Sequence, residues 1–402
     1  MHEPPPFPIA EYEQRLARVR ATMQRRDLDL LVVTDPADIE WLSAFQAARA
    51  MPCLLFVHAT QPPQFLVAEG DHFTLAQTSV YRDVIMYQAG APIGTELISA
   101  LHARAVVVDF IGLQFCAKVR AITDPQRIAL VRAFPSARWA DTTLTIVWLR
   151  AIKSAAELHC LETAMGWAEG ALETASLACV RGASESNILS RMVERMLGSS
   201  KVSGRWPMIP PRVIVGTPSQ GTAATSAARV ITGEYDEDEP WQLVLLECAA
   251  SCNGYHAIAA RTVLIGTTLP ENIKLMERSV NRALNAQLDA MKPGALAKTI
   301  YAAAATVFNS TPIEGWCLGK VGYSVGLCTA PDAADSVLEL TASCEFPLAA
   351  GMVLFLAPWL QTTWGVIALS AMAVVGPRKG RVLGRPTASI SRPDITEVAL
   401  RR

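Results

Sequence analysis

The sequence is poor in charged and aromatic residues, and it contains few histidines. Of its 402 residues, 18% are charged, 7% are aromatic and six are histidines. The formal net charge is −1, whereas nucleic acid or an anionic membrane surface favours a strongly basic partner. We therefore expect no nucleic-acid partner and no membrane partner.

Long apolar runs and closely paired cysteines are also missing. No uninterrupted apolar run reaches the roughly 18 residues that indicate a membrane span. The opening Met-His-Glu-Pro-Pro-Pro lacks the basic flank and the apolar core of a signal peptide, so we expect a cytoplasmic protein. The nine cysteines are scattered without any Cys-x-x-Cys pair, which is typical of reduced and mostly buried thiols.

The chain does contain enough apolar residues for two domain cores, since 51% of it is hydrophobic. Helical spacing over 9–26 leads into a buried strand pattern over 28–34. Further strand-like segments lie at 53–57, 64–67 and 105–110, with helical patterns between them. This alternation predicts an α/β domain.

A second domain is predicted to begin near Arg150. Ser154 and Glu157 form a capping box at the start of a helix with one apolar face. The pattern predicts further helices at 184–197, 270–291 and 296–308. We therefore place the two domains at 1–149 and 150–402.

The most informative stretch of the second domain is 247–262. It follows the apolar run 243–246 and continues into the apolar run 263–266, with Asn253-Gly254 between the two halves. Asn-Gly between apolar segments is a strong signal for a hairpin.

This hairpin carries a resemblance to a known family. An acidic residue, a turn, Gly-Tyr and a closing Arg261-Thr262 are similar to the metal-site hairpin of the creatinase/aminopeptidase P superfamily. The resemblance covers nearly the whole chain, including the segment 35–42. It implies an α/β two-domain protein, with a creatinase-like N-terminal α/β domain and a C-terminal pita-bread α+β domain. In that superfamily the N-terminal domain caps the partner subunit's site, so the resemblance also implies a homodimer.

The residues at the superfamily's metal-ligand positions differ from those of its metallopeptidases. The first carboxylate is kept as Glu247, but the other positions hold Ile258, Tyr323, Ala357 and Ser370. Hard divalent ions need several oxygen or imidazole ligands each, and one carboxylate cannot hold a dinuclear pair. We therefore expect an enzyme without a metal ion or other cofactor.

The metal-independent branch of the superfamily includes creatinase and ectoine hydrolase, and several segments look most like the latter. These are Tyr-His-Ala at 255–257, Gly-Tyr-Ser-Val-Gly-Leu at 322–327, and Ala-Pro-Trp at 357–359 followed by Thr-Trp-Gly at 363–365. One departure is clear, because the region 211–226 lacks the histidine that creatine-hydrolysing relatives use as a proton shuttle. The creatinase mechanism therefore does not carry over intact.

Strand alternation selects a proton-transfer candidate. If position 258 faces the pocket, as in the metalloenzymes, then His256 faces it too, while Tyr255 and Arg261 face away. Histidine has an ordinary pKa near 6.5, which suits acid or base catalysis near neutrality. The alternative is a structural histidine that donates one hydrogen bond.

Glu247 and Tyr323 complete the predicted catalytic set. A lone carboxylate in an apolar cavity pairs with a cation, and an amidinium ring would supply one. Alternatively, Glu247 pairs with Arg261 or another structural base. Tyr323 offers a hydrogen bond and an aromatic face for a cation, and ordinary packing explains it equally well.

We assign a further set of residues to substrate binding. Trp359 and Trp364 would stack a flat ring at the pocket mouth, although core packing also explains tryptophans. Ser370 would orient a water or simply fill the old ligand position. The predicted substrate-binding set is Trp359, Trp364, Ile258 and Ser370.

Together these features favour an enzyme that hydrolyses a non-peptide carbon–nitrogen bond in a small cyclic or amidine-like compound. The same pocket also suits a dehydration, cyclisation or isomerisation step in a biosynthetic pathway. A third hypothesis is a pita-bread scaffold that binds a ligand or protein without catalysis, because Ile258 and Ala357 resemble core filling.

Overall fold

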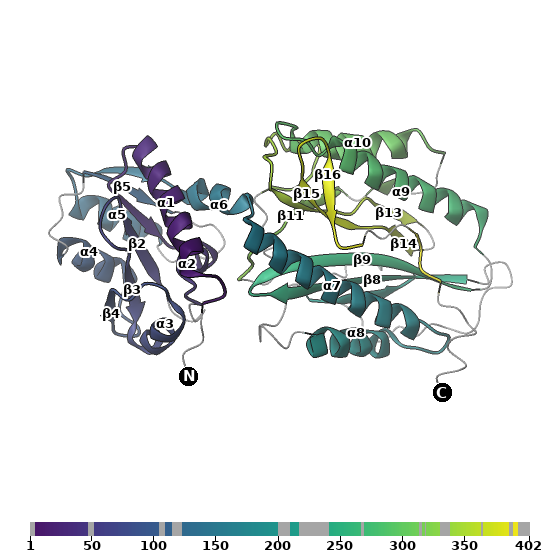
Figure 1. Cartoon of the computed structure of the whole chain (residues 1–402), viewed down its shortest axis with the longest axis horizontal. Helices are drawn as coiled ribbons and strands as arrows, with labels where there is room; N and C mark the ends of the chain where they lie inside the picture. The colour runs from purple at the N-terminus through teal and green to yellow at the C-terminus, as the bar shows by residue number, and fades with distance from the viewer. Residues whose placement is uncertain are drawn as a thin grey trace. The chain divides into compact units, whose positions relative to one another are not determined.

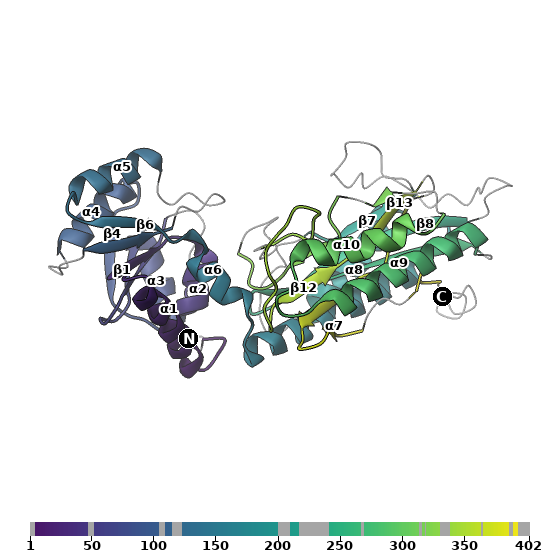
Figure 2. The same ribbon diagram turned by 90° about the horizontal axis from the view of Figure 1, so that it is seen from above.

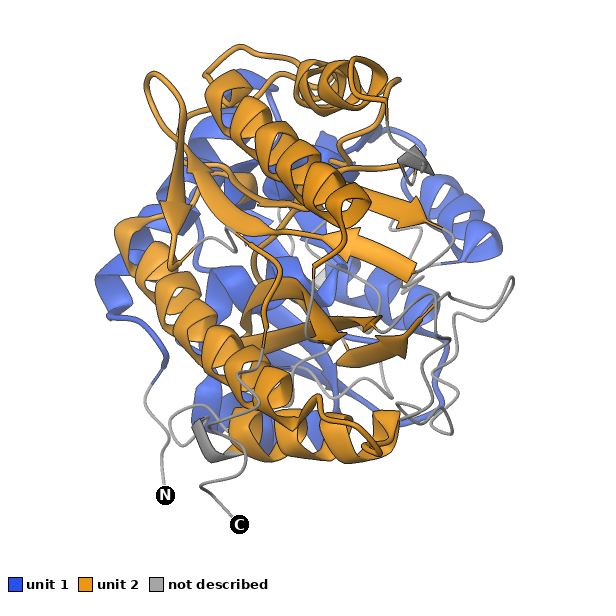
Figure 3. Ribbon diagram, turned by 90° about the vertical axis from the view of Figure 1, so that its right-hand side faces the viewer, with its two compact units in different colours: residues 1–150 blue, residues 151–402 orange. Residues whose placement is uncertain are grey.

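The computed structural model describes most of the chain in two compact units, residues 1–150 (unit 1) and 151–402 (unit 2) (Figure 3). The described residues are 5–46, 52–103, 109–114, 123–199, 210–216, 241–266, 269–312, 316–317, 319–329, 338–362, 365–385 and 389–392. Among them, no helix combines the length and the apolar character that a membrane crossing requires.

Unit 1 is built on a six-stranded sheet with the order β4-β3-β2-β1-β5-β6. Strand β1 is antiparallel to β2 and parallel to β5, so the sheet is mixed. Its strands are β1 (Leu30–Val33), β2 (Leu54–His58), β3 (Gln64–Ala68), β4 (Val84–Tyr87), β5 (Phe110–Leu113) and β6 (Arg138–Asp141). Its helices are α1 (Ile9–Arg25), α2 (Pro36–Ser43), α3 (His72–Thr78), α4 (Ile93–Ala103), α5 (Asp124–Ala133) and α6 (Thr143–Ala151), with the short 3-10 turn η1 (Glu69–Asp71).

One apolar core of unit 1 lies between the sheet and two of these helices. Leu30 and Val32 are two residues apart on β1 and share a face. They belong to a buried cluster with Leu97 of α4 and Leu130 of α5. The apolar run at 28–34 therefore forms the buried strand that its composition predicts.

Unit 2 places strands between two pairs of helices (Figure 1). Helices α7 and α8 contact each other, and α7 packs along β8 and β9. On the other side, α9 and α10 lie side by side (Figure 2). The helices are α7 (Ala155–Ala178), α8 (Glu185–Ser199), α9 (Glu271–Ala290) and α10 (Ala297–Asn309).

The described strands of unit 2 fall into three sheets, with the orders β7-β8-β9, β11-β12-β15-β16 and β10-β13-β14. They are β7 (Arg212–Val215), β8 (Trp241–Cys252), β9 (Tyr255–Gly266), β10 (Trp316–Cys317), β11 (Gly322–Ser324), β12 (Val353–Leu356), β13 (Trp359–Thr362), β14 (Gly365–Ala368), β15 (Ala371–Val375) and β16 (Gly380–Leu383).

The hairpin of β8 and β9 is the longest strand pair of the described chain. Its ladder runs from Trp241 opposite Gly266 to Cys252 opposite Tyr255. Asn253 and Gly254 have positive φ angles of 51° and 81°, as a tight hairpin turn with the right-handed strand twist requires. The predicted Asn-Gly hairpin is confirmed.

Side-chain hydroxyls help to connect the edge of β9 that faces away from β8 to the neighbouring strands. Ser370 accepts a hydrogen bond from the Ala260 amide at 2.8 Å and donates one to the Ala260 carbonyl at 2.9 Å. Thr262 donates to the Val366 carbonyl at 3.1 Å and accepts from the Ala368 amide at 2.8 Å. These contacts replace part of a regular ladder and hold the sheets of unit 2 together.

The helix predictions agree with the structure to within a few residues at each end. The capping box at the start of α7 is present, with the Ser154 amide 2.7 Å from a Glu157 carboxylate oxygen. The strand predicted at 105–110 lies mostly outside the described residues, and the described strand β5 begins at Phe110.

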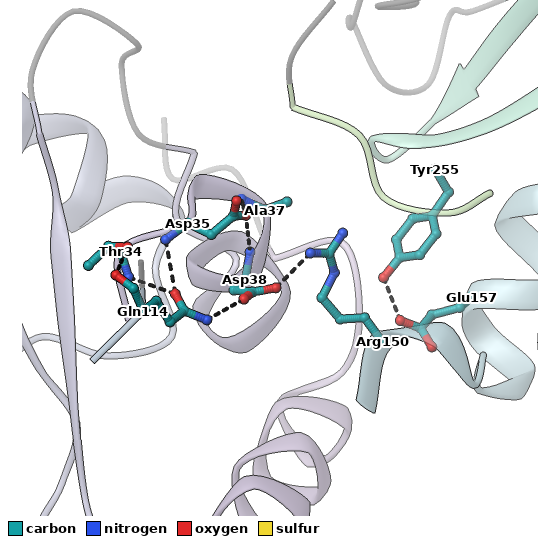
Figure 4. A network of polar contacts seen from close by, with 8 residues as sticks. All are labelled: Thr34, Asp35, Ala37, Asp38, Gln114, Arg150, Glu157 and Tyr255. Atoms are coloured by element: carbon teal, nitrogen blue, oxygen red, sulfur yellow. Dashed lines mark hydrogen bonds and ion pairs between the residues drawn. The ribbon is translucent and has the colours of Figure 1, made fainter. Parts of the chain in front are cut away.

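A buried polar network joins separate segments of unit 1 (Figure 4). Asp38 is fully buried, and its carboxylate accepts hydrogen bonds from Arg150 Nη1 and from Gln114 Nε2, each at 2.6 Å. The Gln114 side-chain oxygen accepts from the amides of Thr34 and Asp35 at 2.9 and 3.1 Å. The network thereby ties the end of β1 and the start of α2 to β5 and α6.

Burial gives this network a predicted pH dependence. Burial raises the pKa of Asp38 from 3.8 to about 7, although the Arg150 guanidinium favours the charged form. The folded state therefore holds a proton that the unfolded state releases, so stability falls as pH rises from about 4 to about 7. We expect the free energy of unfolding of Asp38→Asn, measured with urea, to change less with pH across this window than that of the parent protein. A parent whose stability rises more steeply with pH than that of the variant would show that the Arg150 ion pair outweighs burial.

Candidate functional site

An ion pair between Arg212 and Glu247 lies at the centre of the candidate site. The two residues are directly opposite in the register of β7 and β8. Arg212 Nε donates to Glu247 Oε2 at 2.7 Å, and Nη2 donates to the same oxygen. The Glu247 side chain is 4% exposed and that of Arg212 is 41% exposed. The carboxylate is therefore buried and already paired, while the guanidinium remains accessible.

Tyr323 of β11 lies within electrostatic reach of this pair. Burial raises its pKa, the negative charge of Glu247 raises it further, and the positive charge of Arg212 lowers it. The phenol consequently stays protonated near neutral pH and can donate a hydrogen bond. Its ring centroid is 5.4 Å from that of Phe355, the residue opposite it on β12.

Gly322 allows β11 to approach β12 at this point. Its φ angle is +149°, and a Cβ atom there would overlap the carbonyl oxygen of Phe355. Any other residue would push the two strands apart and displace Tyr323. The glycine next to Tyr323 thus has a specific role in the position of the phenol.

An apolar wall adjoins the ion pair. Ile214 and Leu245 each lie two residues from a member of the pair on the same strand, so they share its face. Trp359 of β13 and Ile214 pack against the buried cluster of Leu245, Val366 and Ala368. The predicted substrate-binding residue Trp359 thus packs against a cluster that includes Leu245, which lies two residues before Glu247 on β8.

His256 lies on the same face of the hairpin but nearer the turn. It is opposite Ser251, whereas Glu247 is opposite Ala260. This offset of four residues along β9 corresponds to about 13 Å at the usual rise of a strand. The structure thus puts His256 and Glu247 on one surface without bringing their backbones close together.

The environment of His256 defines its tautomer. The side chain is buried, and Nδ1 lies 2.8 Å from the Gly254 carbonyl oxygen. A carbonyl oxygen only accepts, so Nδ1 carries the proton in this contact, and Nε2 of the neutral ring is the basic nitrogen. This arrangement suits a general base that acts through Nε2.

The other predicted substrate-binding residues are packed into the sheets. Ile258 is fully buried, and its amide donates to the Met372 sulfur at 3.2 Å. Ser370 is 1% exposed, and its hydroxyl makes the contacts with Ala260 described above. Trp364 lies outside the described residues.

The opposite face of the hairpin contacts α7, as strand alternation predicts. The Tyr255 hydroxyl donates to Glu157 Oε1 at 2.6 Å. Burial lowers the pKa of Arg261, and the nearby carboxylates of Glu173 and Glu169 raise it. Tyr255 and Arg261 therefore support the fold on the α7 side.

Cys252 also belongs to the α7 face. It is 6% exposed and follows Cys248, whose thiol donates to the Ala168 carbonyl of α7 at 3.4 Å. Residues 248 and 252 of β8 have the same parity and face away from Glu247. The Cys252 thiol therefore does not face this site.

The residues at the old ligand positions do not fit a divalent metal pair. Ile258 and Ala357 supply no donor atom, and the Ser370 hydroxyl is engaged with the backbone of Ala260. The positive charge of Arg212 directly contacts Glu247, the remaining carboxylate. Within the described residues, no three or more His, Cys, Asp or Glu side chains gather in a way that could hold a metal ion.

Arg212 is the site residue that sequence reasoning missed. It is a lone cation in the run Arg-Val-Ile-Val of β7, and side-chain alternation puts it on the face of Ile214. That charge in an apolar strand was a usable signal. Its partner could not be read from the sequence, because Glu247 follows 35 residues later.

Comparisons with known proteins agree with this architecture. Residues 159–377 match the model of metallopeptidase family M24, and residues 15–152 match the creatinase/prolidase N-terminal domain. The fold is thus a creatinase-type N-terminal α/β domain followed by a pita-bread domain. The chain belongs to metallopeptidase family M24.

Particular relatives include two curated proteins and a solved structure. Ectoine hydrolase of Halomonas elongata is 25% identical over 387 residues, covering 90% of this chain and 92% of the relative. The uncharacterized hydrolase/peptidase y4tM of Sinorhizobium fredii is 24% identical over 336 residues, covering 81% and 83%. The structure of dipeptidase PepE from Mycobacterium ulcerans aligns with a TM-score of 0.77 at 19% identity, covering 96% of this chain and 99% of that chain. The chain is accordingly hydrolase-like and a distant homologue of ectoine hydrolase.

The side chains at the former metal-ligand positions lead to a prediction about metal binding. We expect the thermal midpoint of chelator-treated protein to stay unchanged when Mn²⁺ or Zn²⁺ is added, because a ligand that binds only the folded state must raise it. Equilibrium dialysis of the same samples should give no stoichiometric uptake of either ion. Uptake of two ions per chain, with a raised midpoint, would contradict the ligand assignment.

Proposed function

We propose that the protein is a metal-independent hydrolase of a non-peptide carbon–nitrogen bond in a small cyclic or amidine-like compound. The observation that carries the proposal is the Arg212–Glu247 ion pair at the one retained ligand position, beside the phenol of Tyr323 and an apolar wall. The distant homology to ectoine hydrolase supports the reaction class.

The proposed catalytic and substrate-binding roles lie at two ends of one face of the β8–β9 hairpin. At the turn end, His256 Nε2 would accept a proton from the attacking water. At the other end, the phenol of Tyr323 would donate a hydrogen bond to the substrate, and Trp359 would pack against its ring. Because the two ends lie far apart along the strand, the scissile bond would lie toward His256.

A second candidate function is a scaffold that binds a small molecule without converting it. The full burial of Ile258 and the engagement of the Ser370 hydroxyl favour this candidate, because both former ligand positions now serve packing. A non-catalytic scaffold would still be stabilised by its ligand.

A turnover assay with matched histidine variants tests the proposal. Chelator-treated protein would be incubated with ectoine, creatine, small lactams and Xaa-Pro dipeptides, and each mixture examined by mass spectrometry. We expect one ring compound to gain a water, and we expect His256→Ala to lose at least about a hundredfold in rate while it remains folded, although loss of a buried side chain lowers its thermal midpoint. His159→Ala, on the exposed side of α7, is the matched control and should keep full activity.

Other outcomes of this assay separate the alternatives. Loss of water from a substrate would indicate a dehydration or cyclisation enzyme in place of a hydrolase. Thermal stabilisation without any mass change would favour the binding scaffold. Unchanged turnover in His256→Ala would remove His256 from the mechanism.

A further inference from the structure

We propose that Arg212 is a specificity-determining residue that receives a carboxylate group of the substrate. This inference rests on the proposed function for the reaction that follows binding, and it concerns the same site. It narrows the substrate class to ring compounds that carry a carboxylate.

Within the described residues, the hydrogen bonds of Arg212 use one edge of its guanidinium. Nε and Nη2 both donate to the same oxygen, Glu247 Oε2. In the part of the chain that the structure describes, these are the hydrogen bonds that Arg212 makes. The adjacent terminal edge, formed by Nη1 and the second N–H of Nη2, presents two parallel donors, which match a carboxylate in bidentate geometry.

The exposure of this ion pair differs from that of a structural pair. In the Arg150–Asp38 pair of unit 1, both side chains are buried, at 5% and 0% exposed. In the surface pair Arg381–Glu162, both are exposed, at 57% and 43%. Arg212 is 41% exposed although its partner Glu247 is 4% exposed. A buried carboxylate thus orients a guanidinium that stays accessible beside the apolar wall.

The charge balance of the site favours a substrate that also carries a positive charge. Glu247 already neutralises Arg212, so a bound carboxylate alone would leave the site with one excess negative charge. Among the described residues, both hydrogen bonds of the pair use Oε2 of Glu247, so Oε1 is the oxygen that would accept from a cationic nitrogen. A ring with a carboxylate and an amidinium or ammonium group would satisfy both members of the pair.

Chemical modification of the intact parent protein tests this role directly. Phenylglyoxal reacts with accessible guanidinium groups, and peptide mapping gives a separate rate for each arginine. We expect L-proline or ectoine to slow the modification of Arg212 about tenfold, because charge-assisted bidentate hydrogen bonds are among the strong ones. L-Prolinamide keeps the ring and the ammonium group but lacks the carboxylate, so it should leave the rate unchanged. Arg381, on the exposed surface of β16, is the internal control and should react equally in all samples.

Two results would overturn the proposal. One is equal protection by L-proline and L-prolinamide, and the other is protection of Arg212 by neither L-proline nor ectoine. The conservative variant Arg212→Lys keeps the positive charge next to Glu247 but loses the two parallel N–H donors of the guanidinium. The variant should therefore fold, but L-proline or ectoine should no longer raise its thermal midpoint.

The outcomes also distinguish this proposal from the proposed function. Protection of Arg212 without turnover of any ring compound would support carboxylate recognition and count against hydrolysis. Turnover of a ring compound without protection of Arg212 by that compound would support hydrolysis and refute the role of Arg212.

Discussion

The ion pair between Arg212 and Glu247 is the interaction on which the candidate site depends. A carboxylate that is 4% exposed is costly unless a positive charge contacts it. The superfamily resemblance implies that metal ions play this part in metallopeptidases, whereas here a guanidinium from the neighbouring strand does so. The same pair influences the pKa of Tyr323 and adjoins the wall that includes Trp359.

The β8–β9 hairpin carries structural and chemical roles on separate faces. One face contacts α7 through Tyr255, Arg261 and Cys248, and these contacts bind the hairpin to the helix layer. The other face bears Glu247 and His256. Because a strand alternates with a period of two, substitutions at the ligand positions can change the chemistry while the α7 contacts persist. This separation allows an M24 fold to persist with residues such as Ile258 and Ala357 at the positions that the resemblance assigns to metal ligands.

Local features of this chain were predictable because their causes are local. The Asn-Gly turn, the Ser154–Glu157 capping box and the two faces of β9 each depend on residues a few positions apart. Strand alternation correctly predicted that Tyr255 and Arg261 face away from the pocket, and the structure has them on the α7 side. Applied to β8, the same rule would also have placed Cys252 there.

Features that depend on pairing between distant segments could not be predicted in the same way. Strand alternation gives the face on which a residue lies but not its position along that face. The separation of His256 from Glu247 therefore became known only from the pairing register of β8 and β9. The partner of Arg212 depended on how β7 aligns with β8. The contacts of Ser370 with the Ala260 backbone likewise follow from the approach of separate sheets.

A double-mutant cycle at Arg212 and Glu247 tests the central claim most directly. Urea unfolding of Arg212→Met, Glu247→Gln and the double variant would give the coupling free energy of the pair. The account predicts that Arg212→Met lowers the free energy of unfolding more than Glu247→Gln does, because it leaves the buried Glu247 carboxylate without a counter-ion. It also predicts that adding Glu247→Gln restores stability, with a coupling of about 1 to 3 kcal/mol. Additive effects of the two substitutions would contradict the claim that Arg212 is the counter-ion on which this site is built.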